Sequence, residues 1–441
     1  MSDYSRGSES DDANSARISE PYHSDRPRID DTGSYDHHYK TNVEEAIKAS
    51  IDTKYEGTFA HAESMNAAPN PGLEVEGYGP IPLPLVPSSA RALIGVCEQA
   101  PFGQGERTVV DKEVRDTWQV NAEKVRFTNP CWGDFIQKSI ENVCATLGVV
   151  VDDTEFKYEL HKLLIYEGGS HFLPHVDSEK QIGMFATMVV IMPSLFEGGA
   201  VHLTNGNGNK VIDVGGPLSA FQTTVLAWYT DIMHEIKPIT SGYRLALSYN
   251  LIRSSSGSLP ALLAPTRDAS TAMLTEALSH WLEGIARGES IPKKFAWLLQ
   301  HKYSRMNMRA SALKGPDMHL VRRLRPIAKE LGLELGLAIV STKVMNGYPS
   351  EEDHYDPSEM WMEGDNRMKF LVDLEGRVVC DAPRFSRGLA GEMMPDGWRK
   401  RMFDSKLSLR EYEGYTGNEA GTVFHWYRRT ALVIWPKGTE P

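Results

Sequence analysis

The chain has 441 residues, of which 41% are hydrophobic and 24% are charged, a composition that is ordinary for a globular protein of about two or three domains. Its 47 Lys and Arg residues against 59 Asp and Glu residues give a formal net charge of -12, which argues against broad electrostatic binding to nucleic acid or to an anionic membrane. The four cysteines include no C-x-x-C pair, which argues against a disulfide scaffold or a zinc knuckle, and we expect a cytoplasmic or nuclear protein.

Residues 1–40 are the first predicted segment, a disordered acidic tail. They carry nine acidic and five basic residues and few large apolar ones, so they bury too little apolar area to offset their chain entropy. Their start shows no apolar h-region, which argues against a secretory signal. The most apolar run of the chain, residues 184–192, is shorter than the roughly 18 residues that a membrane helix needs and is typical of a buried strand.

Residues 41–255 are expected to form a β-rich domain. A helix is predicted over Phe135–Leu147, because apolar residues recur at helical spacing and Gly148 follows as a stop signal. Short strands separated by glycine-rich turns, with little helix between them, indicate an all-β sandwich or jelly roll. The predicted strands span residues 157–166, 185–192, 199–203, 224–229 and 243–252.

The pattern changes after the linker-like SSSGSLP stretch. Residues 256–441 combine two predicted helices with later strand-like segments, so they are expected to be an α+β extension of the first domain or a second domain. The helices are predicted over residues 269–287 and 316–333, and the strands over residues 335–344, 368–374 and 423–435.

Candidate metal ligands gather in the middle of the chain. His175 and Asp177 stand at positions i and i+2, which on a strand places both side chains on one face. His234 follows near the end of another strand-like run. Two imidazoles and one carboxylate on neighbouring strands are the donors of the facial triad that binds non-haem Fe(II) and leaves three positions open. His175, Asp177 and His234 are therefore the candidate catalytic and metal-binding residues.

Arg244 lies shortly after His234, and a turn over Thr240–Gly242 would return it as a strand into the same barrel. A buried guanidinium needs an anion, and its planar fork suits a carboxylate. No acid in the adjacent sequence supplies one, whereas a dicarboxylate co-substrate would.

These residues carry a resemblance to a known family. The segments YEGGSHFLPHVDS, VVIMPSLFEGGAVHL and WYTDIMHEIKPITSGYRLALSYNL, within residues 166–251, resemble the prolyl 4-hydroxylase-like branch of the 2-oxoglutarate- and Fe(II)-dependent dioxygenases. The similar part is about a fifth of the chain, and the flanking segments resemble fungal members of the superfamily.

The resemblance implies a double-stranded β-helix (jelly-roll) core, with supporting helices and the α+β C-terminal extension around it. It implies that His175, Asp177 and His234 bind Fe(II), that Arg244 binds the distal carboxylate of 2-oxoglutarate, and that Tyr166 donates a hydrogen bond to this co-substrate. The implied reaction uses O2, hydroxylates a C–H bond and converts 2-oxoglutarate to succinate and CO2, with ascorbate left open as an accessory reductant. The substrate, a protein side chain such as proline or a small molecule, stays open.

Two other functions remain open from the residues alone. The first is a non-catalytic jelly-roll module that binds a carboxylate ligand or a protein, and the second is a cupin-like metal dioxygenase without a keto-acid co-substrate. Other candidate side chains are given structural roles: His161 in a strand, His171 in a loop, Trp228 in the core and Asp231 at a turn. A second H-x-D string, His354 and Asp356, falls in an expected loop, where the strand argument does not apply.

Overall fold

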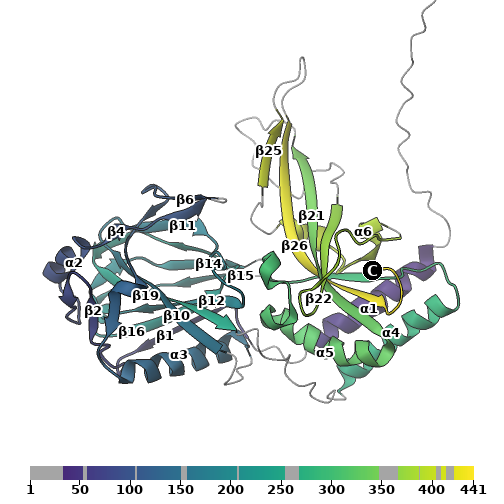
Figure 1. The fold of residues 1–441 in the computed structure, drawn as a ribbon, viewed down its shortest axis with the longest axis horizontal. Coiled ribbons are helices and arrows are strands. Elements are labelled where there is room, and N and C mark those ends of the chain that lie inside the picture. Colours follow the sequence, from purple (N-terminus) through teal and green to yellow (C-terminus); the bar gives the residue numbers. More distant parts are fainter. Residues whose placement is uncertain are drawn as a thin grey trace, which may run out of the picture.

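The computed structural model describes residues 33–52, 57–104, 107–149, 156–205, 208–253, 268–346, 366–386, 388–403, 409–413 and 422–441. These residues form two bodies that lie side by side, a β-rich lobe and an α+β lobe (Figure 1). No helix of the described residues is both long and apolar enough to cross a membrane. Residues 1–32 of the predicted tail and the second H-x-D string lie outside the described residues.

The β-rich lobe contains two antiparallel sheets that share one core. Val189 and Leu226 from the larger sheet and Phe172 and Leu203 from the smaller sheet belong to the same buried apolar cluster. The larger sheet has the order β1 (Ala60–Met65), β16 (Thr223–Tyr229), β12 (Met184–Ile191), β19 (Arg244–Arg253), β10 (Phe156–Tyr166), β8 (Trp118–Asn121) and β4 (Glu98–Gln99). The smaller sheet has the order β15 (Gly208–Ile212), β14 (Val201–Asn205), β17 (Met233–Ile236), β11 (His171–His175) and β7 (Arg115–Asp116).

Smaller elements complete this lobe. Helix α3 (Cys131–Leu147) lies along the larger sheet (Figure 1), and Trp132 donates a hydrogen bond from its indole to the Tyr249 hydroxyl at 3.2 Å. The helix ends at Gly148, whose φ of 68° is the left-handed cap predicted from the sequence. The remaining elements are β2 (Leu73–Val75), β3 (Gly79–Pro80), β5 (Phe102–Gln104), β6 (Arg107–Val109), β9 (Val125–Phe127), β13 (Phe196–Gly198), β18 (Ile239–Gly242) and helix α2 (Pro87–Ile94).

The second lobe has its own sheet and its own apolar clusters. Helices α4 (Ala269–Ala286) and α5 (Gly315–Leu331) confirm the two helices predicted for this part of the chain, and α5 ends at Gly332 with a φ of 68°. The sheet has the order β23 (Val378–Cys380), β22 (Asn366–Asp373), β21 (Leu333–Asn346), β26 (Thr422–Pro436), β20 (Phe295–Leu298) and β24 (Met393–Met394), with β25 (Leu409–Glu413) beside β26. Short helices α6 (Gly388–Glu392) and α7 (Trp398–Phe403) accompany it.

Helix α1 (Gly33–Asp52) differs from the sequence-based expectation. The boundary expected at residue 40 falls inside this helix, and its apolar residues join the core of the second lobe rather than that of the β-rich lobe. The reason is a buried stripe at helical spacing, formed by Tyr39, Val43, Ala46 and Ile47. Residues 41–52 therefore pack with α4, more than 200 positions later in the chain.

Candidate metal centre

The two candidate histidines come from neighbouring strands of the smaller sheet. His175 ends β11, His234 lies in β17, and the two are directly paired across the antiparallel ladder. Their ring centroids are 4.1 Å apart. His234 is 3% exposed, and His175 stacks on Phe172 with 3.4 Å between the ring centroids. The ladder register thus fixes both imidazoles at one place.

Backbone carbonyls orient both rings in the same way. Nδ1 of His175 lies 2.8 Å from the Leu173 carbonyl oxygen, and Nδ1 of His234 lies 3.0 Å from the Ile232 carbonyl oxygen. Because a carbonyl oxygen only accepts, each Nδ1 carries a proton, and Nε2 of each ring is the atom that can bind a metal. This outer hydrogen bond is the usual way in which a metal-binding histidine is oriented.

Asp177 reaches the histidines from a loop and not from a strand. β11 ends at His175, so the strand alternation that motivated the pairing of these two residues stops before Asp177. Two residues of the larger sheet hold the carboxylate instead: Oδ2 accepts hydrogen bonds from the Thr187 hydroxyl at 2.7 Å and from the Trp228 indole at 3.2 Å. Oδ1 lies 3.7 Å from Nε2 of His234.

The pKa shifts of His175 and Asp177 favour the protonation states that a bound cation requires. Burial, followed by the charge of His234, lowers the pKa of His175 to about 3, so the imidazole is neutral near neutral pH. Burial alone would raise the pKa of Asp177, but the two imidazoles and the hydrogen bonds from Thr187 and Trp228 outweigh it and lower that pKa. A neutral imidazole at His175 and an ionised carboxylate at Asp177 are forms that a divalent metal binds.

The donor set fits a metal ion. One ligand atom each from His175, Asp177 and His234 lie within 4.8 Å of one another. Two imidazole nitrogens and one carboxylate oxygen match the preferences of non-haem Fe(II), and the same atoms would also accept other first-row divalent ions.

Arg244 is buried in the same cavity without an acidic partner. It is the first residue of β19, is 1% exposed and donates from Nη1 to the Gly199 carbonyl oxygen at 3.0 Å. Its Nε has no hydrogen-bond partner, and no ion pair to it exists among the described residues. Burial lowers the pKa of Arg244, which is the cost of holding this charge away from water. A bound carboxylate would satisfy it.

Tyr166 stands beside this arginine. The two residues are cross-strand neighbours in β10 and β19, and the guanidinium carbon of Arg244 lies 5.3 Å from the centre of the Tyr166 ring. A cavity of about 320 Å³ reaches Tyr166, Arg244 and the three candidate metal ligands. The five residues named from the sequence therefore face one cavity.

Sequence reasoning missed several polar residues that line the same cavity. They include Arg115, Lys162 and Lys180, which carried no motif, and His161, which the sequence gave a structural role. A register shift between Leu160 and Lys162 explains why two adjacent residues of β10 both face inward. Alternation along a regular strand would have sent one of them outward.

Two other sequence expectations need adjustment. The Trp228 indole holds the Asp177 carboxylate, so this residue is more than a core aromatic. His171 begins β11 and does not lie in a loop, but its structural role stands, because it contacts the carbonyl oxygens of Gly169 and Glu113 and does not line the cavity.

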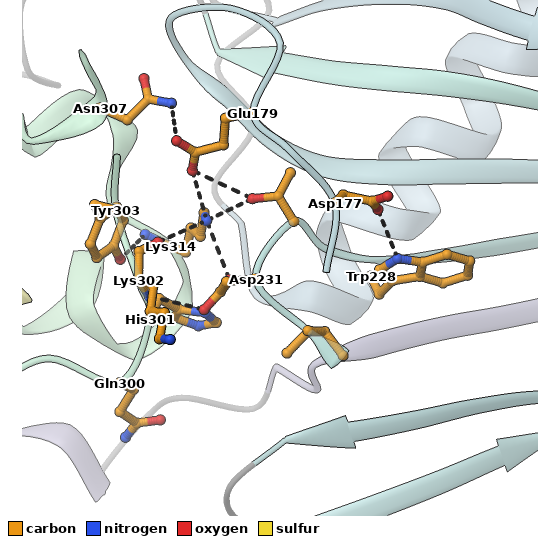
Figure 2. Close-up of polar contacts among 12 residues, drawn as sticks. Asp177, Glu179, Trp228, Asp231, Gln300, His301, Lys302, Tyr303, Asn307 and Lys314 are labelled. Atoms are coloured by element: carbon orange, nitrogen blue, oxygen red, sulfur yellow. Dashed lines mark hydrogen bonds and ion pairs between the residues drawn. The ribbon is translucent and has the colours of Figure 1, made fainter. Parts of the chain in front are cut away.

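Asp231 belongs to a buried cluster of charges that joins the two lobes. Figure 2 shows Lys314, at the start of α5, reaching Glu179 and Asp231 of the β-rich lobe. Lys314 is 1% exposed, and its Nζ lies 3.2 Å from Glu179 Oε1 and 3.3 Å from Asp231 Oδ1. Asp231 also accepts from the Lys302 amide at 3.0 Å and contacts His301 Nδ1 at 3.1 Å.

This interlobe cluster lies next to the candidate centre. Glu179 is two residues after Asp177, and Asp231 is three residues before His234. The segments that carry Asp177 and His234 are thus held to the second lobe by ion pairs and hydrogen bonds. A search for motifs in the sequence does not reveal these contacts.

No protein-family model and no curated protein sequence matches the chain. Solved structures that match include a prolyl hydroxylase from Trichoplax adhaerens in complex with a hypoxia inducible factor oxygen degradation domain peptide fragment. The match has 14% identity, covers 51% of this chain and 94% of that chain, and has a TM-score of 0.30. A Pseudomonas putida prolyl-4-hydroxylase has 14% identity over 47% of this chain and 99% of that chain, with a TM-score of 0.28. A 2OG-Fe(II) oxygenase family oxidoreductase from Burkholderia pseudomallei has 16% identity over 37% of this chain and 78% of that chain, with a TM-score of 0.23. The chain is therefore similar to two solved prolyl hydroxylases and to a solved oxidoreductase of the 2OG-Fe(II) oxygenase family.

Proposed function

We propose that the β-rich lobe is an Fe(II)- and 2-oxoglutarate-dependent oxygenase with a jelly-roll core that hydroxylates a C–H bond of its substrate. One observation carries this proposal: two oriented imidazoles, one ionised carboxylate and a buried arginine without an acidic partner face a single cavity. A binding module has no need of a metal donor set, and a metal oxygenase without a keto acid has no need of the arginine.

Each of these residues has a defined task in the proposed reaction. Nε2 of His175, Nε2 of His234 and a carboxylate oxygen of Asp177 would hold the iron. When bound, the iron supplies the redox chemistry that couples decarboxylation of 2-oxoglutarate by O2 to oxidation of a C–H bond. Arg244 grips the distal carboxylate of 2-oxoglutarate, and the Gly199 carbonyl oxygen holds the guanidinium in place.

Tyr166 is assigned a supporting part. Its ring covers the guanidinium of Arg244, and its buried position beside the arginine suits a hydrogen bond to the co-substrate. The pocket keeps water away from the arginine, which strengthens its attraction for a carboxylate. Ascorbate is not part of the proposal, because no feature of the described residues points to it.

The first test is an anaerobic titration with Fe(II) and 2-oxoglutarate. The wild-type protein is expected to bind both and to develop the visible charge-transfer band of an iron–keto acid complex. His175→Ala should abolish metal binding, whereas His171→Ala serves as a matched control, because this histidine of the same strand does not line the cavity. No band in the wild-type protein would favour the non-catalytic binding module.

A second test separates keto-acid-dependent chemistry from other metal chemistry. Arg244→Leu should leave Fe(II) binding in place and weaken 2-oxoglutarate binding by about tenfold or more, since a charge-assisted hydrogen bond is worth roughly 1.5–3 kcal/mol. Unchanged affinity for 2-oxoglutarate would favour the cupin-like alternative. Products that gain one oxygen atom in a lysate incubated with enzyme, Fe(II) and 2-oxoglutarate, and that vanish with His175→Ala, would identify the substrate.

A further inference from the structure

Three cations besides Arg244 face the cavity of the candidate centre. Arg115 comes from β7, Lys162 from β10 and Lys180 from the segment between β11 and β12. Among the described residues that line this cavity, Asp177 is the only acid. None of the three cations forms an ion pair with an acid within the described parts of the chain.

Arg115 is the innermost of these three cations. Its Nη1 donates to the Pro101 carbonyl oxygen at 2.8 Å, and its guanidinium carbon lies 4.5 Å from the centre of the Phe172 ring. Its Nε is buried and has no hydrogen-bond partner. Burial lowers the pKa of Arg115, opposed by the neighbouring Tyr166 and by the charge of Asp177. The arginine is therefore held close to the metal ligands with part of its hydrogen-bonding capacity unused.

Lys162 and Lys180 add positive charge to the lining of the cavity. Lys162 donates to Gln119, whose amide donates in turn to Glu98 at 2.7 Å, so an amide stands between the lysine and the nearest acid. Burial, followed by repulsion from Arg115, lowers the pKa of Lys162. Lys180 is exposed and stands at the mouth. The pKa of His161 falls to about 4, first through burial and then through the charges of the two lysines.

The proposed cofactors do not neutralise this excess of positive charge. The cavity holds four cations against the single carboxylate of Asp177. The charge of Fe(II) and the charge of 2-oxoglutarate cancel, so three positive charges stay uncompensated when both are bound. Like charges that face one cavity repel one another, and those held away from water are costly unless an anion joins them.

We propose that the substrate carries a carboxylate or phosphate group, and that Arg115 and Lys180 bind this group. Lys162 adds to the positive electrostatic potential of the cavity. The inference rests on the proposed function, because it takes Arg244 as the site of the keto acid. Arg115 packs on the Phe172 ring, which stacks on His175, so the anionic group would sit close to the metal and fix which carbon faces it. A cavity of about 320 Å³ that must also admit 2-oxoglutarate leaves room for a small acid or for the acidic end of a longer molecule.

The experiment uses the full chain under anaerobic conditions with Fe(II) and saturating 2-oxoglutarate. Inorganic phosphate and propionate are the probes, one for each kind of anion, and their binding is followed through the change that each causes in the charge-transfer band. The variants are Arg115→Gln, Lys180→Gln and the double variant. Lys124→Gln is the matched control, since Lys124 is an exposed lysine of the same lobe outside the cavity.

At least one probe is expected to bind the wild-type and Lys124→Gln proteins. The double variant should bind that probe about tenfold or more weakly, the loss expected for a charge-assisted hydrogen bond, and should lose much less affinity for 2-oxoglutarate. A response to phosphate alone assigns a phosphate group, and a response to propionate alone assigns a carboxylate. Saturating 2-oxoglutarate keeps either probe from reporting on Arg244.

Three results would overturn the inference. Probes that bind the wild-type protein and the double variant equally, or that bind neither, would show that these cations do not form an anion site. A double variant that loses 2-oxoglutarate binding while Arg244→Leu retains it would show that the cations serve the keto acid instead. If the wild-type protein forms no iron–keto acid complex at all, the proposed function fails first and the inference falls with it.

Discussion

Replacing Lys314 by Met removes the only cation that lies between two buried carboxylates in the described part of the interlobe cluster. The Lys314 ammonium contacts Glu179 at 3.2 Å, the Thr230 hydroxyl at 2.8 Å, Asp231 at 3.3 Å and the Lys302 carbonyl oxygen at 3.3 Å. The exposed fractions of the side chains are 1% for Lys314, 9% for Glu179 and 13% for Asp231. Burial disfavours the charge on Lys314, but the two carboxylates outweigh it and raise its pKa.

The expected loss in the free energy of unfolding is about 3–5 kcal/mol, the range found when one partner of a buried ion pair is removed. Met fills much of the volume of the lysine stem, so most of the loss comes from two carboxylates left facing each other. Urea denaturation is the suitable assay, because guanidinium is a salt and screens the charges under study. Lys329→Met, an exposed lysine on the same helix, should change the unfolding free energy by less than about 0.5 kcal/mol.

A double variant isolates the electrostatic part of this loss. Adding Asp231→Asn to Lys314→Met removes one of the two carboxylates that have lost their cation. The double variant should therefore lose less free energy of unfolding than the two single variants lose in sum. A Lys314→Met protein that unfolds within about 0.5 kcal/mol of the wild type would refute the reasoning, as would strict additivity.

Three further predictions concern the candidate centre. Thr187→Val removes the 2.7 Å hydrogen bond to Asp177 at nearly constant volume, and the affinity for Fe(II), measured by anaerobic titration, should fall about 10- to 100-fold; an unchanged affinity would deny that bond a role. Gly199→Ala forces a side chain onto a φ of 70°, which should cost about 1–2 kcal/mol in urea denaturation and weaken 2-oxoglutarate binding, because the Gly199 carbonyl oxygen holds Arg244; equal stability and affinity would contradict this. The pKa of His161 is about 4 in the folded protein, below its unfolded value of about 6.5, so the unfolded chain takes up a proton first as the pH falls. The contribution of His161 to the free energy of unfolding is therefore complete above about pH 6.5 and is lost as the pH falls toward 4. His161→Gln should therefore flatten the decline of unfolding free energy between these pH values, and an unchanged slope would count against the assignment.

Local signals explain what the sequence could predict. The apolar runs of β12 and β19 and the glycines that end α3 and α5 are signals that each act within a few residues. His175 and His234 could be paired because a ladder of neighbouring strands is the simplest way to bring two separated histidines together.

The rest depends on contacts that no local pattern records. Arg115 lies in a strand of two residues, too short for any periodicity, and the bulge beside Lys162 changes which side chains face inward. The apolar stripe of α1 is visible in the sequence, but its partner is a helix more than 200 residues away. The sequence around Lys314 does not distinguish it from a surface lysine, because the two acids that it contacts belong to the other lobe.

The most direct test of the proposed centre is a crystal structure of the protein grown anaerobically with Fe(II) and 2-oxoglutarate, with the metal located by anomalous scattering. We expect one iron bound by Nε2 of His175, Nε2 of His234 and a carboxylate oxygen of Asp177, with the distal carboxylate of the keto acid against Arg244. Iron bound by other residues, or a keto acid whose distal carboxylate lies away from Arg244, would contradict the account.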